Sequence, residues 1–329
     1  MEKFVKELLT EKVLNEVKNL YAINELYYVG GFENFIYGFD KDNQSYIVRI
    51  SHSSHRTIAQ IKAEIDFIFY LSNNNANVST PIFSVNNNLV EKITLENNSY
   101  FTVCAYTKAI GQPPSRTNLT ESLFYNYGKT IANFHKLTKS YQLKEGLLPR
   151  YTWDEDILIK DASKFLDAKD KIILEKLNEL IIKINSIERT KDNFGLIHTD
   201  IHFGNFFIHN DNLTVFDFDD VAYQYFISDI AIALFYLVYL LNDEEKMELA
   251  DRFMKNFMKG YFEENKLAKE DFLKINLFLK LREIILYIVI HKTLNIEESK
   301  FAQTYINKYR ERIINDIEFI NLDFEKYYY

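Results

Sequence analysis

The chain has few of the residues that cross-link a polypeptide or interrupt its secondary structure. It contains 1 cysteine, 4 prolines and 9 glycines in 329 residues, which excludes an intrachain disulfide and is not typical of a disordered chain. It also lacks a cationic excess, since 39 Lys and Arg stand against 47 Asp and Glu; the net charge of -8 argues against a nucleic-acid partner. The longest apolar stretch, residues 230–241, is shorter than the roughly 20 residues that a membrane helix needs. The N-terminus has no apolar core of a signal peptide. We therefore expect a cytoplasmic protein without membrane or nucleic-acid partners.

Apolar and aromatic side chains are plentiful. Hydrophobic residues make up 47% of the chain, with 27 Phe and 23 Tyr, and the length favours two lobes around a cleft. The apolar spacing predicts helix over 3–23, strands near 26–29, 35–38, 46–50, 81–85, 89–93 and 100–106, and a helix over 57–71. No proline follows Pro149, so helices are expected at 119–139, 154–167, 169–187, 226–242, 244–264, 269–296 and 298–319. The prediction is an α+β fold with a small antiparallel-sheet lobe, residues 1–106, and a large helical lobe, residues 107–329.

Residues 194–220 carry the clearest chemical pattern. An apolar run leads to His198 and Asp200, Asn205 follows five residues after Asp200, and a hairpin-like stretch ends at Asp217. A transferring phosphoryl group needs an acceptor oxygen held in line and its own charge neutralised, with little covalent work left for the protein. Asp200 fits the general base, a contribution of roughly 10²–10⁴ in rate.

A divalent metal follows from the same segment. Asn205 and Asp217 offer oxygen ligands of the kind that Mg²⁺ prefers. Between residues 198 and 220 there are five aspartates and no Lys or Arg, so a polyanion such as ATP needs bound cations to approach. Magnesium and ATP, or GTP, are therefore the expected cofactor and co-substrate.

Single residues of this segment also have simpler explanations. A His-x-Asp pair is commonly a loop, and Asn-Asp-Asn is commonly a hairpin corner; it is the combination that favours phosphoryl transfer. For His198 we expect a structural role, a buried imidazole bonded to the loop backbone, in preference to catalysis. Asp219 is expected near the acceptor, with capping of the next segment as the alternative.

The first lobe offers matching nucleotide-binding parts. Gly30 and Gly31 lie between the first two predicted strands, where a glycine pair lets the backbone approach phosphates or simply makes a hairpin turn. Arg49 alternates with apolar neighbours on the third strand, and its fork of donors suits phosphates. Glu64, on the following helix, could pair with Arg49, although an exposed glutamate is the commoner case.

Taken together, these segments resemble the aminoglycoside phosphotransferase and choline kinase-like family, which shares the two-lobed protein-kinase fold. The segments that carry the resemblance are 30–37, 46–49, Glu64, 128–135, 198–205, 216–220 and 229–231. The resemblance implies that Asp200 is the catalytic base, that Asn205 and Asp217 bind Mg²⁺, and that Arg49 contacts phosphate. It further implies that residues near Cys104 and Tyr106 border the adenine and that Asp229 braces the catalytic loop.

Two departures from the family pattern concern the acceptor. Thr199 stands where the family commonly has Gly, and the 218–220 ending resembles a subgroup that includes bacterial stress-response kinases. The leading hypothesis is an enzyme that phosphorylates a hydroxyl of a small molecule, with amino-bearing acceptors among the candidates. The alternatives are a stress-response-type Ser/Thr protein kinase and a nucleotide-binding regulator without turnover. A helix expected from residue 226 leaves no long activation segment after Asp217, which favours small acceptors.

Overall fold

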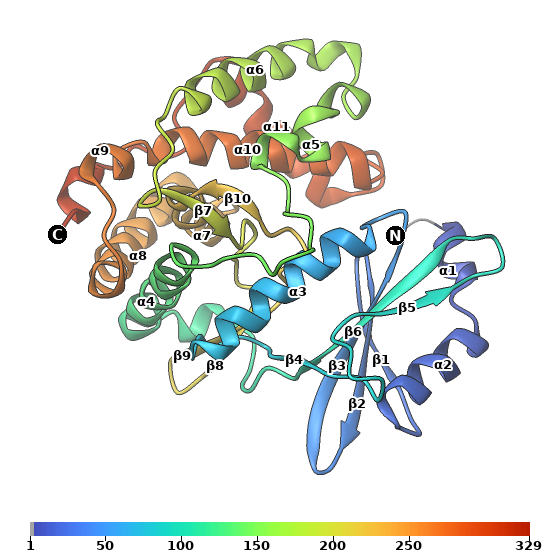
Figure 1. Cartoon of the computed structure of the whole chain (residues 1–329). Helices are drawn as coiled ribbons and strands as arrows, with labels where there is room; N and C mark the ends of the chain where they lie inside the picture. The colour runs from blue at the N-terminus through green and yellow to red at the C-terminus, as the bar shows by residue number, and fades with distance from the viewer. Residues whose placement is uncertain (1–2) are drawn as a thin grey trace. The chain divides into compact units, whose positions relative to one another are not determined.

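The computed structural model describes residues 3–329, and the chain divides into two compact units (Figure 1). Unit 1 comprises Met1–Gly111, Tyr141–Arg150 and Thr214–Asp219; its residues 1–2, with which the predicted first lobe also begins, lie outside the described residues. Unit 2 comprises Gln112–Ser140, Tyr151–Leu213 and Asp220–Tyr329. The chain therefore contributes two short later segments to the unit built mainly from its N-terminal third.

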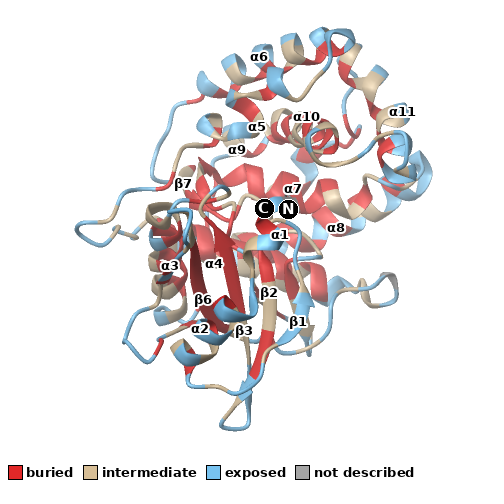
Figure 2. Cartoon of the chain, turned by 90° about the vertical axis from the view of Figure 1, so that its right-hand side faces the viewer, coloured by how far each residue is buried: buried red, intermediate tan, exposed pale blue. Residues whose placement is uncertain are grey.

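An antiparallel sheet forms the centre of unit 1. Its strands are β1 (Tyr27–Gly30), β2 (Phe35–Lys41), β3 (Gln44–His52), β4 (Pro81–Ile82), β5 (Glu91–Thr94) and β6 (Tyr100–Thr107), in the order β1-β2-β3-β6-β4 with β5 also paired to β6. Asp42 and Asn43 adopt left-handed conformations in the tight turn that joins β2 to β3, as Asp and Asn in such turns commonly do. Figure 2 shows that β6, in the middle, is buried and that β1, at the edge, is exposed.

The two faces of this sheet differ, because side chains alternate along β3. Val48 and Ile50 are fully buried in an apolar cluster with Val13 and Val17 of α2 (Glu11–Tyr21), beside α1 (Lys3–Leu8). Arg49 points to the other face, where α3 (Ile58–Asn73) lies (Figure 1). A Thr57 capping box starts α3, which fixes where the helix begins. The apolar face stabilises unit 1, and the α3 face receives its buried charges.

Unit 2 is mainly helical. Its helices are α4 (Glu121–Thr138), α5 (Ile157–Lys160), α6 (Lys171–Asn185), α7 (Phe226–Val238), α8 (Asp243–Glu264), α9 (Lys269–Phe272), α10 (Ile275–Thr293) and α11 (Lys300–Ile314). Short 3₁₀ turns lie at Arg116–Asn118, Trp153–Glu155, Ala162–Lys164, Ala168–Asp170 and Phe324–Tyr327. Helix α7 is buried along almost its whole length, which explains its continuous apolar sequence without a membrane role. Within residues 3–329 we find no helix long and apolar enough to cross a bilayer.

Short strands flank the segment that carries the phosphotransfer pattern. Strand β7 (Phe194–Ile197) pairs antiparallel with β10 (Ala222–Tyr225), while β8 (Phe206–His209) pairs with β9 (Asn212–Val215). Asn210 and Asp211 are left-handed and turn the second pair into a hairpin, as the sequence predicted. The residues between β7 and β8 thus form a loop anchored at both ends.

The α+β class with an antiparallel N-terminal sheet is confirmed, and the differences from prediction are local. The helix predicted over 154–167 is instead a series of short turns, because the Asp156 carboxylate accepts from the Leu158 backbone and starts a new helix there. The helix predicted over 269–296 is divided into α9 and α10. Strand β10 was not predicted, since it is only four residues long and its strand conformation depends on pairing with β7.

Candidate active site

In unit 2, a buried carboxylate fixes the loop that follows β7. Asp229, in the first turn of α7 and 1% exposed, accepts backbone N–H groups from His198 at 3.3 Å and Thr199 at 2.9 Å. His135 of α4 lies behind it, with Nε2 3.2 Å from the same carboxylate. The imidazole of His198 is buried, and its Nδ1 accepts the Asp200 backbone N–H at 3.3 Å. The loop is therefore held through its backbone, and the Asp200 side chain is not needed to anchor it.

Thr199 adopts an unusual backbone conformation at the centre of this loop. Its φ of 61° is left-handed, which β-branched residues rarely adopt. Its hydroxyl donates to the carbonyl of Asp220 at 2.6 Å, and its N–H is held by Asp229. A left-handed backbone at this position explains why related proteins commonly have glycine here. In this chain the two hydrogen bonds of Thr199 stabilise the same conformation with a threonine.

Both carboxylate oxygens of Asp200 have partners. Arg282 of α10 donates to Oδ1, and Asn205 donates to Oδ2 at 3.2 Å, with His202 Nε2 3.3 Å from the same oxygen. Burial alone would raise the pKa of Asp200, but Arg282, followed by His202 and His198, lowers that pKa to about 2. The carboxylate is therefore ionised at neutral pH. It is suited to accept a hydrogen bond from an alcohol and to orient it, as a loose phosphoryl transition state requires.

Asn205 is oriented so that its amide oxygen is left for another ligand. Its Nδ2 donates to the backbone carbonyl of Asp200 at 2.9 Å as well as to the Asp200 carboxylate. Both partners only accept, so the amide nitrogen must face them and Oδ1 must face elsewhere. An amide oxygen beside a carboxylate is a donor set that fits a hard divalent cation.

In unit 1, Arg49 and Glu64 form a buried ion pair. Arg49 Nη2 lies 2.8 Å from Glu64 Oε2, and the two side chains are 5% and 0% exposed. The guanidinium also approaches Oδ1 of Asp219 at 3.6 Å. Burial acts to lower the pKa of Arg49, but Glu64 and its other neighbours raise that pKa well above its usual value. The β3 cation is therefore permanently charged and held in one position.

Asp219 is surrounded by basic side chains of unit 1. His55 Nε2 lies 2.6 Å and Arg56 Nε 3.3 Å from its carboxylate, and Arg150 donates to its backbone carbonyl at 2.7 Å. Burial opposes ionisation, but His55, Arg56 and Arg49 hold the pKa of Asp219 far below its usual range. Glu33 also lies within 4.8 Å of His55 and Asp219, yet the two arginines make this group a poor metal site.

The remaining predicted residues of unit 1 lie at and just after the end of β1, on β6 and after β9. Gly31 has a φ of 130°, and a Cβ there would come within 1.9 Å of the Asn34 carbonyl, so only glycine fits; Gly30, at a φ of 155°, has open space around it. Cys104 pairs with Arg49 across the sheet, and the Tyr106 ring lies 5.8 Å from the Arg49 guanidinium. Asp217 follows β9 with a φ of 62°. Thus unit 1 brings Arg49, Glu64, Cys104, Tyr106 and Asp219 together, and unit 2 brings together His198, Asp200, Asn205 and Asp229.

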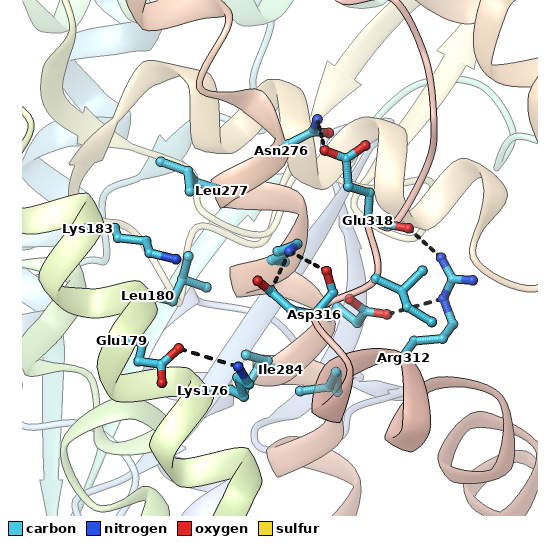
Figure 3. Close-up of a pocket in the computed structure, with 14 residues that line it drawn as sticks. Lys176, Glu179, Leu180, Lys183, Asn276, Leu277, Ile284, Arg312, Asp316 and Glu318 are labelled. Atoms are coloured by element: carbon cyan, nitrogen blue, oxygen red, sulfur yellow. Dashed lines mark hydrogen bonds and ion pairs between the residues drawn. The ribbon is translucent and has the colours of Figure 1, made fainter.

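Unit 2 contains two cavities of different character. One, of about 80 Å³, is lined by Thr199, Asp220 and Arg282 and otherwise mainly by apolar residues. The other, of about 140 Å³, lies between α6, α10 and α11 and carries charges that are largely paired with each other (Figure 3). Lys176 pairs with Glu179, Lys280 with Asp316, and Asn276 donates to Glu318. Of these two cavities, the smaller one borders the loop between β7 and β8, through Thr199.

Several residues of the site were missed from the sequence. Arg282, His202 and His135 contact Asp200 or Asp229, and His55 and Arg56 contact Asp219. The His55-Arg56 pair between a strand and a helix was a detectable signal, because two basic residues precede a helix N-terminus that disfavours them. Arg282 carried no signal, since it is one cation among several on a long helix.

The fold and the loop define the class of the molecule, a phosphotransferase with a protein-kinase-like fold. Residues 28–270 match the phosphotransferase enzyme family. Amicoumacin kinase of Bacillus subtilis (strain 168) is 32% identical over 290 residues, which are 87% of this chain and 86% of that protein. The chain therefore belongs to the phosphotransferase enzyme family.

Solved structures agree with this assignment. The amicoumacin kinase hAmiN, in complex with AMP-PNP, Ca²⁺ and Ami, has a TM-score of 0.94 and 30% identity, covering 99% of each chain. A microcompartment-associated aminopropanol kinase has a TM-score of 0.75 at 18% identity, covering 93% of this chain and 98% of that one; it supports the fold alone. The recognition made from the sequence is confirmed, and the chain is a kinase that transfers phosphate to a hydroxyl of a small molecule.

Proposed function

We propose that this kinase transfers the γ-phosphate of ATP, with Mg²⁺, to a hydroxyl of an amicoumacin-like small molecule. The main support is the similarity to hAmiN, which spans 99% of both chains at 30% identity and a TM-score of 0.94. Agreement over the whole length includes the helical unit, in which acceptor pockets of this fold are expected. Amicoumacin is therefore the first acceptor to test, and amino-bearing alcohols are the second class.

In this proposal Asp200 is the catalytic base. Its ionised carboxylate receives a hydrogen bond from the acceptor hydroxyl and aligns the oxygen with the γ-phosphorus. It takes up the proton as the new O–P bond forms and the bond between the γ-phosphorus and the β-phosphate oxygen breaks, releasing ADP. Asp229 holds the backbone beside it, and buried His198 supports the loop from within. These contacts keep the carboxylate in place without a large movement on substrate binding.

Asn205 and Asp217 are the proposed Mg²⁺ ligands. The orientation of the Asn205 amide supports this, because its nitrogen is committed to Asp200 and its oxygen is not. When bound, the divalent ion neutralises the phosphate oxygens of the nucleotide. The hAmiN structure contains Ca²⁺, which takes the same class of hard oxygen ligands.

Nucleotide binding is assigned to the N-terminal lobe, residues 1–106. Gly30 and Gly31 would cover the phosphates, Arg49 held by Glu64 would contact them, and the β6 segment at Cys104 and Tyr106 would border the base. The buried Arg49–Glu64 pair supports this assignment, because a fixed cation is suited to bind a polyanion in a chain of net charge -8. The helical lobe, residues 107–329, would supply the catalytic loop and the acceptor site.

The other functions considered from the sequence are less well supported. The names of both amicoumacin kinases describe small-molecule kinases, which does not favour a Ser/Thr protein kinase. A regulator without turnover would be expected to lose catalytic groups, whereas Asp200, Asn205 and Asp217 are all present. An enzyme that consumes ATP is expected to act in the cytoplasm, where ATP is supplied. The assay described next, run with ATP and with GTP, determines which nucleotide the enzyme prefers.

A coupled ADP- or GDP-release assay with amicoumacin, aminoglycosides, amino alcohols and a generic protein substrate tests the proposal. We expect turnover that depends on a small acceptor and is lost in Asp200→Asn, while that variant still binds Mg-nucleotide. Asp217→Asn, which tolerates the left-handed backbone at this position, should weaken Mg-nucleotide binding as well. Full activity of Asp200→Asn would contradict the mechanism, and turnover only with the protein substrate would contradict the acceptor class.

A further inference from the structure

Arg282 contacts the proposed catalytic base, Asp200. Neither the sequence pattern nor the family match indicates this residue. It lies on α10, 82 residues after Asp200 and beyond the matched span of residues 28–270. Yet it donates to Oδ1 of the Asp200 carboxylate, the group to which an acceptor hydroxyl must also come. Whatever binds beside Asp200 therefore meets this guanidinium.

The position of Arg282 is fixed on several sides. The same Nη2 that donates to Asp200 also donates to the Tyr236 hydroxyl, and the guanidinium lies 4.7 Å from the Tyr236 ring centroid. Burial acts to lower the pKa of Arg282, but Tyr236 and Asp200 raise that pKa above its usual value, so the side chain stays charged. With Asn205 and His202 at Oδ2, Arg282 at Oδ1 restricts rotation of the carboxylate. This arrangement is suited to position a base.

Arg282 also has a donor that is not used within the protein. Its Nε is buried and has no hydrogen-bond partner in the described structure. Buried donors are normally paired, because a lone one loses its hydrogen bonds to water without a replacement. Arg282 lines the 80 Å³ cavity together with Thr199 and Asp220. An oxygen of a bound molecule would satisfy this donor.

The rest of the cavity is mostly apolar. Its wall residues include Trp153, Leu158, Ile159, Phe278, Leu281 and Ile285. The volume is about half that of the engineered 150 Å³ cavity that binds benzene, so the cavity suits a small alkyl group. The charged part of the lining has both signs, since Arg282 is accompanied by Asp156 and Asp220.

We propose that Arg282 positions the Asp200 carboxylate and donates through Nε to an oxygen of the acceptor, whose neighbouring alkyl group enters the cavity. The proposal rests on the phosphotransferase function proposed above and narrows its acceptor class. The part of the acceptor next to the reacting hydroxyl carries a carbonyl or hydroxyl oxygen and bears a small apolar substituent.

The first test compares Arg282→Lys with Arg312→Lys in steady-state assays. Arg312, on α11, is also largely buried and donates to carbonyl oxygens of Glu318 and Phe319, so it matches Arg282 without touching Asp200 (Figure 3). Lysine cannot reproduce the fork. We expect Arg282→Lys to lower kcat by about 10²-fold, as for a misplaced catalytic group, and to raise the acceptor KM, with the nucleotide KM unchanged. Arg312→Lys should stay within about twofold of wild type, as expected for a residue outside the site.

Two further variants separate positioning from folding. Arg282→Ala should lose more activity than Arg282→Lys and regain part of it with added guanidinium ion, but not with sodium at equal ionic strength. Leu281→Phe, which fills the cavity, should raise the acceptor KM about tenfold through lost burial of an alkyl group, with little change in kcat. Acceptors that share the reacting hydroxyl should show the same KM difference when the adjacent alkyl group is removed.

The outcomes distinguish this inference from the function on which it rests. If wild type shows no acceptor-dependent turnover, both are overturned. If wild type turns over while Arg282→Lys keeps its kcat, or falls only as far as Arg312→Lys, the positioning function of Arg282 is wrong and the proposed function stands. An acceptor KM unchanged in Leu281→Phe would overturn the cavity as the alkyl site.

Discussion

Thr199 combines backbone strain with two compensating hydrogen bonds beside Asp200, the proposed base. A left-handed conformation costs an L-residue about 1–2 kcal/mol, and the Thr199 hydroxyl bond to the Asp220 carbonyl offsets part of this cost. The carbonyl so engaged belongs to the segment that follows Asp217 and Asp219. A single side chain thus links the catalytic loop to the start of β10 within unit 2.

Substitutions at Thr199 should separate these two effects. Thr199→Ala keeps the strained backbone and loses the hydroxyl bond, whereas Thr199→Gly loses the bond and relieves the strain. We expect the glycine variant to be more stable than the alanine variant by about 1 kcal/mol. Urea denaturation measures the difference, with wild type as the reference. If alanine is as stable as glycine, the backbone at this position is not left-handed in solution.

His135 gives the catalytic loop a dependence on pH. Its neighbours are Asp229 at Nε2, the Tyr261 hydroxyl at Nδ1, the stacked Phe226 ring and the Lys139 charge. These partners fit a neutral imidazole that donates from Nε2 and accepts at Nδ1. Burial lowers the pKa of His135 below its usual 6.5, despite the opposing effect of Asp229. Below pH 6.5, His135 is therefore protonated in the unfolded chain at pH values where it is still neutral in the folded chain.

The sign of the effect follows from this difference in proton binding. The contribution of His135 to stability is complete above pH 6.5 and is lost as the pH falls through the folded-state pKa. Wild type should therefore lose more stability between pH 7.5 and 5.5 than His135→Asn does. Denaturation of both proteins at several pH values measures their free energies of unfolding. The other titrating groups are the same in both proteins, so their contributions cancel in the difference between wild type and His135→Asn. Parallel curves would show that His135 has an unshifted pKa.

At the residue scale, spacing along the chain indicated the groups of the catalytic loop but not their partners. Asp200 and Asn205 lie within one loop, so their separation of five residues already predicts their proximity. Arg282 and Asp229 reach that loop from α10 and α7, and only the packed structure brings them there. The role assigned to Asp229 came from family resemblance, whose last segment is 229–231 and which therefore did not include Arg282.

At the element scale, α4 and α8 cross at a pair of glycines. A Cβ added to Gly128 of α4 would lie 1.9 Å from the Phe257 carbonyl, and one added to Gly260 of α8 would lie 2.0 Å from the Tyr125 carbonyl. Each helix therefore places its backbone against a glycine of the other. This contact brings His135 of α4 within reach of Tyr261 and of Asp229.

Gly260→Ala should consequently destabilise the protein although alanine favours helices. The methyl group would meet backbone, which cannot move aside, and overpacking of this kind costs about 1–3 kcal/mol. Lys259→Ala, at an exposed position one residue earlier in α8, serves as the matched control and should change stability little. Urea denaturation of both variants decides the matter. A Gly260→Ala variant as stable as Lys259→Ala would mean that the helices do not pack this closely.

Elements with a continuous apolar stripe were predictable, and those made by capping or pairing were not. The helix expected over 119–139 is observed as Glu121–Thr138, because its period and its Thr120 cap agree. The helix expected over 154–167 does not form as one element, because Asp156 caps a new turn. The spacing of apolar residues does not reveal such a cap. Strand β10 depends on β7, so its own sequence could not reveal it.

At the scale of the whole molecule, an acidic chain must bind an acidic nucleotide. The net charge is -8, and residues 198–220 add five aspartates without a Lys or Arg. The cations available for phosphate are few and fixed, Arg49 above all, and Asp219 and Glu64 already balance it. A divalent ion is therefore the natural source of the missing positive charge. Nucleotide affinity should depend on that ion more than on any one side chain.

Thermal unfolding with a non-hydrolysable ATP analogue tests this dependence. At about 100 times its dissociation constant a ligand stabilises a protein by about 2.7 kcal/mol, which raises Tm by several degrees in a protein of this size. We expect that rise with Mg²⁺ and AMP-PNP, and most of it should disappear with EDTA or in Asp217→Asn. Asp200→Asn is the matched control, because it removes a charge from the site but not a proposed metal ligand, and it should keep the rise. If Asp217→Asn responds to Mg²⁺ as strongly as wild type does, the metal is bound by other groups.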